Sequence, residues 1–261
     1  MTNDLTLLTG ATGLVGGLWA ERLIRKGRAV IALSRSEHRP DSKLPCIRAD
    51  LKKPGLGLSS EVRNYLQANV SEIVHCAADT RFNAPLSESR ETNITGTLRM
   101  LELARGCTAL RKFAHISTVY VAGLQAGTIP ERVHHEEREF TTTYEDTKAE
   151  AEREILRESC VPAAVYRLST AVGDSATGAI RQLNWFHKIA RLAQWLPGLP
   201  GEPVRNTPVD LIASDWSADV LEFLFHQRFE EGIVYHVCAG ESHSIDLPDL
   251  FELLFSESKR R

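Results

Sequence analysis

Short apolar, β-branched runs alternate with longer stretches in which apolar residues recur every three or four positions. The short runs predict strands and the longer stretches predict helices. We expect strands over residues 5–9, 29–33, 46–49, 72–76, 112–117, 163–168 and 233–237, and helices over residues 14–26, 59–68, 91–105, 144–158, 180–196, 214–225 and 247–255. Since strands joined by helices pair in parallel through right-handed crossovers, this order predicts an α/β protein with a Rossmann-type, doubly wound parallel sheet.

The pattern changes in the last third of the chain, where the sequence Pro-Gly-Leu-Pro-Gly occupies residues 197–201. Pro and Gly end helices, so we expect a small lobe to leave the main sheet there. We predict a Rossmann domain over residues 1–178, with a strand and a helix contributed from about 205–240. Residues 179–261 then form a small C-terminal substrate-binding lobe that is not an independent domain.

Composition excludes several classes of protein. The 31 Lys and Arg residues against 34 Asp and Glu give a net charge of −3, so we expect no nucleic-acid partner. No apolar run approaches the roughly 18 residues of a membrane span, and no signal peptide is recognisable. The five cysteines are odd in number and lack a C-x-x-C pair. This predicts a cytoplasmic protein with neither a disulfide framework nor a metal site.

Three glycines at intervals of three connect the first predicted strand to the first helix, in the sequence Gly10-Ala11-Thr12-Gly13-Leu14-Val15-Gly16. In a dinucleotide site, the first glycine permits a tight turn and the second lets a pyrophosphate approach the backbone. The third lets the helix pack close to the sheet. The helix N-terminus adds amide donors and a partial positive charge. A tight turn without a ligand gives a similar sequence, but the position between strand and helix favours a dinucleotide site.

The second predicted strand is followed by Ser34 and Arg35. An acidic residue here would bind the ribose 2′-hydroxyl of NAD, whereas an arginine can pair with the 2′-phosphate of NADP. We therefore expect NADP, with NAD as the alternative. A solvent-facing arginine at the end of a strand is the structural alternative.

Tyr144 and Lys148 are four residues apart and therefore share one face of a predicted helix. A nearby ammonium favours the phenolate, so we expect Tyr144 to exchange a proton near neutral pH. The same spacing on a surface helix is often only a stabilising pair. Ser117 and Thr118 end the preceding predicted strand, where a hydroxyl could face the same pocket and hold a substrate carbonyl.

Other histidines and aromatic residues have structural explanations. His75, His115 and His236 lie within predicted strands, and we interpret them as core or sheet-end histidines. Three aromatic residues of the last third either line an acyl or pantetheine channel or pack the lobe: Trp185, Phe186 and Trp195.

Motifs along most of the chain resemble those of the extended short-chain dehydrogenase/reductases. They lie at residues 9–16, 49–58, 75–79, 93–97, 116–121, 144–148, 172–178 and 208–210. Two of them, D-L-x-K-P-x-L-G-L at residues 50–58 and G-D-S-x-T-G at residues 173–178, are similar to the branch of thioester, carboxylic acid and fatty acyl reductases.

The resemblance implies a catalytic triad of Thr118, Tyr144 and Lys148. It also implies that Asp50 and Leu51 flank the adenine of the cofactor and that Leu168 lies beside the nicotinamide. The cofactor-binding set that follows is Gly10, Thr12, Gly13, Leu14, Val15, Gly16, Arg35, Asp50, Leu51, Ala77, Ala78, Thr80, Asn93, Ser117, Tyr144, Lys148 and Leu168.

The resemblance further implies an oxidoreductase that reduces an activated acyl group, as a carrier-protein-bound or CoA thioester, to an aldehyde with NADPH. An extended reductase, dehydrogenase or epimerase acting on a ketone or a nucleotide sugar is the second hypothesis. A non-catalytic NADP-binding sensor or scaffold is the third. The expected partner is the acyl substrate, small or carrier-tethered, and a homodimer remains an option.

Overall fold

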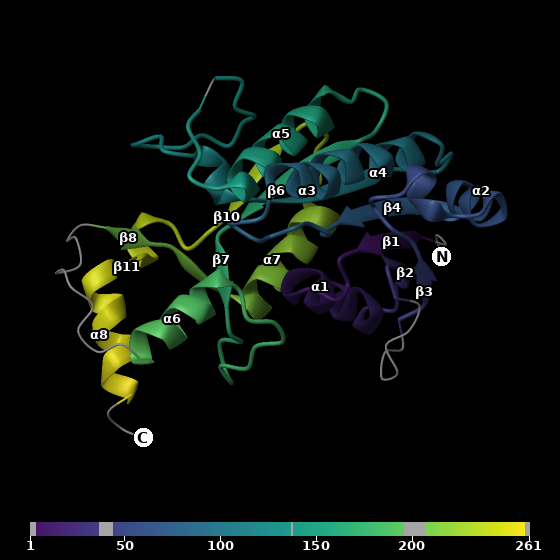
Figure 1. The fold of residues 1–261 in the computed structure, drawn as a ribbon. Coiled ribbons are helices and arrows are strands. Elements are labelled where there is room, and N and C mark those ends of the chain that lie inside the picture. The colour runs from purple at the N-terminus through teal and green to yellow at the C-terminus, as the bar shows by residue number, and fades with distance from the viewer. Residues whose placement is uncertain (1–3, 37–43, 137, 196–206, 259–261) are drawn as a thin grey trace.

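The computed structural model describes residues 4–36, 44–136, 138–195 and 207–258. Seven parallel strands form one sheet with helices on both faces (Figure 1). Their spatial order is β10 (Val234–Val237), β6 (Ala163–Leu168), β5 (Lys112–Thr118), β4 (Val70–His75), β1 (Leu5–Thr9), β2 (Ala29–Ser34) and β3 (Cys46–Arg48). This arrangement confirms the predicted Rossmann-type fold.

Each face of the sheet has its own apolar core, and adjacent residues of one strand point into different cores. Leu7 belongs to the core under α2 (Ser60–Asn69), α4 (Gly96–Arg105) and α5 (Thr143–Arg157). Leu8 belongs to the core under α1 (Leu14–Arg25) and α7 (Ser214–Gln227). Strands buried on both faces are apolar at nearly every position, which explains the continuous runs in the sequence.

The helix that we expected over residues 91–105 begins earlier. The chain enters a helix after Pro85, as α3 (Leu86–Arg90), passes through one π-helical turn at Glu91–Thr95 and continues as α4. Pro85 is the N-cap residue, with φ −54° and ψ 136°, and a proline is tolerated at the start of a helix because the N–H that it lacks would have no partner there. The early start places Asn93 in the middle of the helical path.

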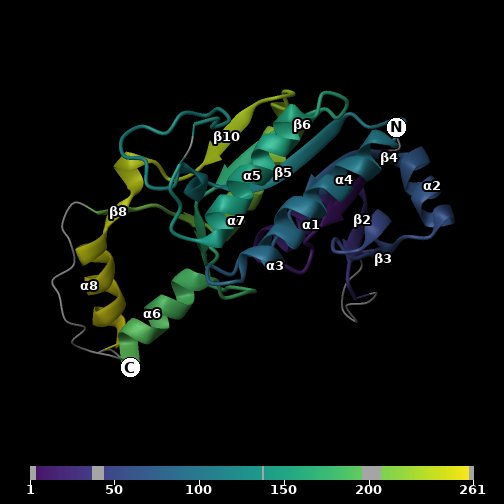
Figure 2. The ribbon, with the colours of Figure 1, turned by 45° about the horizontal axis from the view of Figure 1, so that its top comes forward.

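The C-terminal part adds two small sheets and two helices. β7 (Thr170–Val172) pairs with β9 (Leu211–Ala213), and β8 (Pro208–Val209) pairs with β11 (Ile245–Asp246). Helix α6 (Trp185–Trp195) contacts α8 (Leu247–Ser258) at the end of the molecule farthest from α2 and β3 (Figures 1 and 2). α7 and β10 return to the main sheet. The proposed division of the chain at residue 178 stays a prediction.

The prediction of helix over residues 180–184 is wrong. α6 starts at Trp185, because Asn184 caps it: the Asn184 Oδ1 atom accepts a hydrogen bond from the backbone N–H of His187 at 3.3 Å. Short 3₁₀ helices occur at Val119–Ala122 and Glu241–His243, whereas Pro54–Gly57 is a turn in which Gly55 and Leu56 have positive φ. Among the helices of the described ranges, none combines the length and hydropathy that crossing a bilayer requires.

Candidate active site

A crevice of about 700 Å³ lies at the carboxyl ends of β1, β2, β4, β5 and β6. Its volume falls within the range of small-molecule sites. The chain runs from β1 to β2 and β3 in one direction and continues with β4 on the other side of β1. Doubly wound sheets bind ligands at such a switch point, outside the carboxyl ends of the strands.

Most of the predicted site residues line this crevice. They are Gly10, Thr12, Gly13, Leu14, Val15, Gly16, Arg35, Asp50, Leu51, Ala77, Ala78, Thr80, Ser117, Thr118, Tyr144 and Leu168. Two others, Asn93 and Lys148, are buried behind the wall, at 1% and 2% exposure. The structure therefore brings together segments that lie more than one hundred residues apart in the sequence.

The glycine turn has the geometry of a phosphate cradle. Gly10 has a φ of +76°, and a Cβ atom there would lie 2.7 Å from the backbone nitrogen of Ala77. A Cβ at Gly16 would lie 2.5 Å from the Gly10 carbonyl oxygen, so the helix could not approach the turn. A Cβ atom at Gly13 would lie 3.3 Å from its nearest neighbour, the Gly10 carbonyl oxygen. Gly13 is also the N-cap residue of α1 and has no side chain that could cap the helix. The first amides of α1 can therefore donate to an anion in the crevice.

The far end of the crevice is lined by the ends of β2 and β3. Arg35 is exposed there, next to Ser34. The Asp50 carboxylate accepts a hydrogen bond from the backbone N–H of Lys52 at 3.0 Å, and the Leu51 carbonyl accepts one from Arg99 at 2.6 Å. These contacts fix the turn after β3 as a wall of the crevice.

Thr118 and Tyr144 meet at the opposite end. The Thr118 Oγ1 atom accepts a hydrogen bond from the backbone N–H of Tyr120 at 3.2 Å, which leaves its own O–H to donate. Burial raises the pKa of Tyr144, and a hydrogen bond with the Thr118 side chain opposes this only in part. The expectation that the Tyr144 pKa lies near neutrality is wrong: burial dominates, and the side chain that lowers this pKa is that of Thr118.

Lys148 lies behind this pair, with its ammonium directed into the sheet. Its Nζ atom is 2.7 Å from the Ile116 carbonyl oxygen and 3.0 Å from the His115 Nε2 atom. Burial lowers the pKa of Lys148 to about 8, while Glu152 and Cys76 act to raise it. The amine is thus positioned by β5, one turn along α5 from Tyr144.

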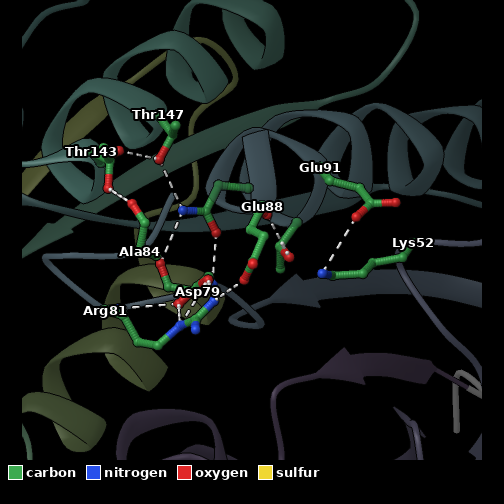
Figure 3. A network of polar contacts seen from close by, with 10 residues as sticks. Lys52, Asp79, Arg81, Ala84, Glu88, Glu91, Thr143 and Thr147 are labelled. Carbon is green, nitrogen blue, oxygen red and sulfur yellow. Dashed lines mark hydrogen bonds and ion pairs between the residues drawn. The ribbon is translucent and has the colours of Figure 1, made fainter. Parts of the chain in front are cut away.

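Asn93 fastens the loop after β4 to α5. Its Oδ1 atom accepts from the Asp79 backbone N–H at 2.7 Å, and its Nδ2 atom donates to the Asp79 carbonyl and to the Thr147 hydroxyl, each at 3.0 Å. Figure 3 shows the surrounding network, in which Arg81 bridges Asp79 and Glu88. The structure does not bring Asn93 to the crevice, so its contribution is to hold the crevice wall.

An aromatic wall lies beside Tyr144, and of its rings only that of Trp185 was among the residues considered for an acyl channel. The Phe82 ring stacks on the Tyr144 ring, with ring centroids 5.8 Å apart. The centroid of the Trp185 ring lies 5.4 Å from that of Phe82 and 6.2 Å from that of Tyr120. All four rings line the crevice. Trp185 therefore belongs to the site, whereas Phe186 packs against Trp185 and His187. The Trp195 side chain lies outside the described residues.

Among the described residues, no group of three or more His, Cys, Asp or Glu side chains is arranged to hold a metal ion. His134, which stands next to a second histidine in the sequence, is buried. Its two ring nitrogens contact Arg138 and Arg167.

The sequence of this chain matches those of known proteins. The sequence pattern described as male sterility protein matches residues 34–221. Fatty acyl-CoA reductase 1 of Gallus gallus is 34% identical over 142 aligned positions, which cover 44% of this chain and 28% of that protein. One of the linear gramicidin synthase subunits of Brevibacillus parabrevis is 27% identical over 243 positions, covering 81% of this chain and 5% of that protein. The chain thus spans less than a third of either relative.

A solved structure with the same fold is the terminal R domain from the myxalamid PKS-NRPS biosynthetic pathway. It superposes with a TM-score of 0.81 at 24% identity, over 97% of this chain and 69% of that one. At this identity the likeness concerns the fold.

Proposed function

Since the chain belongs to the male sterility protein family, we propose that it reduces an activated acyl group to an aldehyde with NADPH. The acyl group is a thioester of CoA or of a carrier protein. The family lies in the thioester and fatty acyl reductase branch of the extended short-chain dehydrogenase/reductases, as the motifs predicted. These are NAD(P)-dependent oxidoreductases, the class of enzyme that we expected.

The observation that carries the proposal is the meeting of Thr118 and Tyr144 in the crevice that begins at the glycine turn. Two hydroxyl groups from different elements converge beside a cradle suited to a dinucleotide. Lys148 lies directly behind them, held by the strand that ends in Thr118. A reductase needs these components: a bound hydride donor, hydrogen-bond donors for the carbonyl oxygen, and a proton source.

The residues present fit the cofactor. Gly10, Gly13 and Gly16 have no side chains, so nothing at these three positions covers the N-terminus of α1, and a pyrophosphate can approach it. Arg35 would pair with a 2′-phosphate, which favours NADP over NAD. Asp50 and Leu51 would flank the adenine, and Ala77, Ala78, Thr80, Ser117 and Leu168 would line the path to the nicotinamide. When bound, NADPH supplies the hydride.

Thr118 and Tyr144 would hydrogen-bond the carbonyl oxygen as negative charge develops on it. A well-placed donor of this kind is worth roughly 3–4 kcal/mol in the transition state. Because burial raises its pKa, Tyr144 is protonated at neutral pH, which is the form that gives a proton in a reduction. Lys148 would support the phenol as it loses that proton.

Thioester chemistry follows from the same geometry. Addition of hydride to the carbonyl carbon and of a proton to its oxygen gives a hemithioacetal. Cleavage of its carbon–sulfur bond, with the hydroxyl proton passing to sulfur, releases the aldehyde and a free thiol. The aromatic wall of Phe82, Tyr120 and Trp185 stands next to the reacting position and favours an apolar acyl group there.

The test is NADPH oxidation by the purified chain with a panel of acyl-CoA thioesters, ketones and nucleotide sugars, with product identification by mass spectrometry. We expect aldehyde and free CoA from the thioesters. Turnover of the ketones or nucleotide sugars instead would replace this proposal by the ketone reductase or epimerase alternative. NADPH binding without turnover of any compound would favour a sensor.

A further inference from the structure

A row of buried polar side chains crosses the sheet beneath the crevice. The register pairs Thr9 of β1 with His75 of β4, and His75 with His115 of β5. Each of these three residues is 1% exposed, and Lys148 of α5, at 2%, ends the row. Buried polar groups are expensive unless each finds a hydrogen-bond partner, so the row requires an explanation.

The hydrogen bonds of His75 determine its tautomer. The Thr97 hydroxyl donates to the Asn93 carbonyl at 2.6 Å, so its oxygen accepts from the His75 Nε2 atom at 3.1 Å. The Thr9 oxygen accepts from the Ala77 N–H at 3.1 Å, and its hydroxyl donates to His75 Nδ1 at 2.8 Å. His75 is thus neutral, with its proton on Nε2 and both nitrogens paired. It is the satisfied core histidine that the sequence predicted.

His115 differs from this pattern. Its Nε2 atom lies 3.0 Å from the Lys148 Nζ atom, and a lysine ammonium only donates, so Nε2 accepts. The proton of the neutral ring is then on Nδ1, which has no hydrogen-bond partner among the described residues. An unpaired buried N–H costs about 1–3 kcal/mol, and an apolar side chain of similar size would avoid that cost. Packing therefore does not explain His115, but the contact with Lys148 does.

We propose that His115 is a positioning residue for Lys148: its Nε2 atom and the Ile116 carbonyl hold the ammonium behind Thr118 and Tyr144. This rests on the proposed function, in which Lys148 supports the phenol of Tyr144. Two of the three N–H bonds of the ammonium are used, at 3.0 and 2.7 Å, and one is left for a further acceptor. His115 does not line the crevice, so it acts through Lys148.

The titratable groups that face Lys148 come from three elements. His115 lies on β5, His75 ends β4 and Cys76 directly follows it, and Glu152 and Tyr144 lie on α5. Burial disfavours the charged amine, whereas a neutral imidazole that accepts its hydrogen bond favours it. Removal of the acceptor should therefore let Lys148 lose its proton at a lower pH. The fall of kcat at high pH, the alkaline limb of the pH–rate profile, would then begin at a lower pH.

A matched pair of variants separates the acceptor from the shape of the side chain. In His115→Gln the amide oxygen can stand near the position of Nε2, whereas His115→Leu has no acceptor. We expect His115→Leu to lose about tenfold or more in kcat, a part of the 10²–10⁴ that proton transfer contributes. We also expect its alkaline limb to shift to lower pH and His115→Gln to restore both. A folded His115→Leu protein with the turnover and pH profile of the unchanged chain would overturn the proposal.

Nitrogen-15 NMR of the histidine rings tests the same contact without any assay. We expect the ring of His115 to carry its proton on Nδ1 and the ring of His75 on Nε2, with the His115 signals assigned by their loss in His115→Gln. A His115 ring protonated on Nε2 would refute the contact with Lys148. If the tautomer is as expected but no thioester is reduced, the contact stands and the proposed function fails.

Discussion

The Glu152 carboxylate and the Arg167 guanidinium form an ion pair inside the protein, 2.7 Å apart, with side chains 2% and 0% exposed. Glu152 lies on α5 two turns beyond Tyr144, and Arg167 lies on β6. Arg167 also donates to His134 at 3.0 Å and to His236 at 3.2 Å. One buried cation thus joins the helix that carries Tyr144 to β6, to β10 and to the loop that precedes the helix.

Removal of this cation should destabilise the whole fold. We expect Arg167→Met to reduce the free energy of unfolding by about 3–5 kcal/mol, because Glu152 is left as an unpaired buried charge. The double variant with Glu152→Met should recover part of that loss. Urea denaturation measures both. A loss below about 1 kcal/mol for the single variant would mean that the pair behaves as an exposed one.

Arg35 should distinguish the two nicotinamide cofactors. Charge-assisted hydrogen bonds are worth about 1.5–3 kcal/mol, so Arg35→Ala should weaken NADPH binding by about 10- to 100-fold. NADH binding should not change, since NADH lacks the 2′-phosphate. Titration calorimetry with both cofactors makes the comparison, with Arg25→Ala, an exposed arginine of α1, as the control. Equal weakening for the two cofactors would remove Arg35 from the 2′-phosphate site.

Trp185 should determine how well long acyl groups are used. We expect Trp185→Ala to lower kcat/KM for dodecanoyl-CoA by about tenfold, or 1.4 kcal/mol, and to affect butanoyl-CoA less. Phe223→Ala is the matched control, because Phe223 is 49% exposed on α7 and lies outside the crevice. An equal loss for the two substrates would assign Trp185 to packing of the lobe alone.

The buried histidines should make the protein sensitive to acid. Burial and the charge of Lys148 lower the pKa of His75 from 6.5 to about 3. Between these values the unfolded chain binds a proton that the native chain does not, so stability falls as the pH falls. For this one residue the slope reaches about 1.4 kcal/mol per pH unit. Urea midpoints between pH 7.5 and 5 measure it. An unchanged slope in His75→Gln would contradict this assignment.

Sequence reasoning found the sheet, the glycine turn and the Tyr144–Lys148 pair because each depends on local signals. Runs buried on both faces, three spaced glycines, and two residues four apart on a helix can all be recognised without a structure. The start of α6 could also have been found, because Asn184 is a favoured N-cap residue. The strands of two or three residues near the C-terminus are too short to leave a periodic pattern.

Contacts between distant segments were not predictable. Phe82 lies two residues beyond the segment assigned to the cofactor path, but only the structure shows its ring stacked on Tyr144. His115 was interpreted as a core histidine, and nothing in the sequence indicates that Lys148 points at its ring. The direction of the Tyr144 pKa depends on burial, which the spacing of two residues does not reveal.

Proton transfer from Tyr144 is the central claim, and single-turnover kinetics of Tyr144→Phe with NADPH and an acyl-CoA test it most directly. We predict that the rate of NADPH oxidation falls by about 10²–10⁴-fold while NADPH still binds. Aldehyde formation should fall in parallel. A Tyr144→Phe protein that oxidises NADPH and forms aldehyde at the rate of the unchanged chain would contradict the claim.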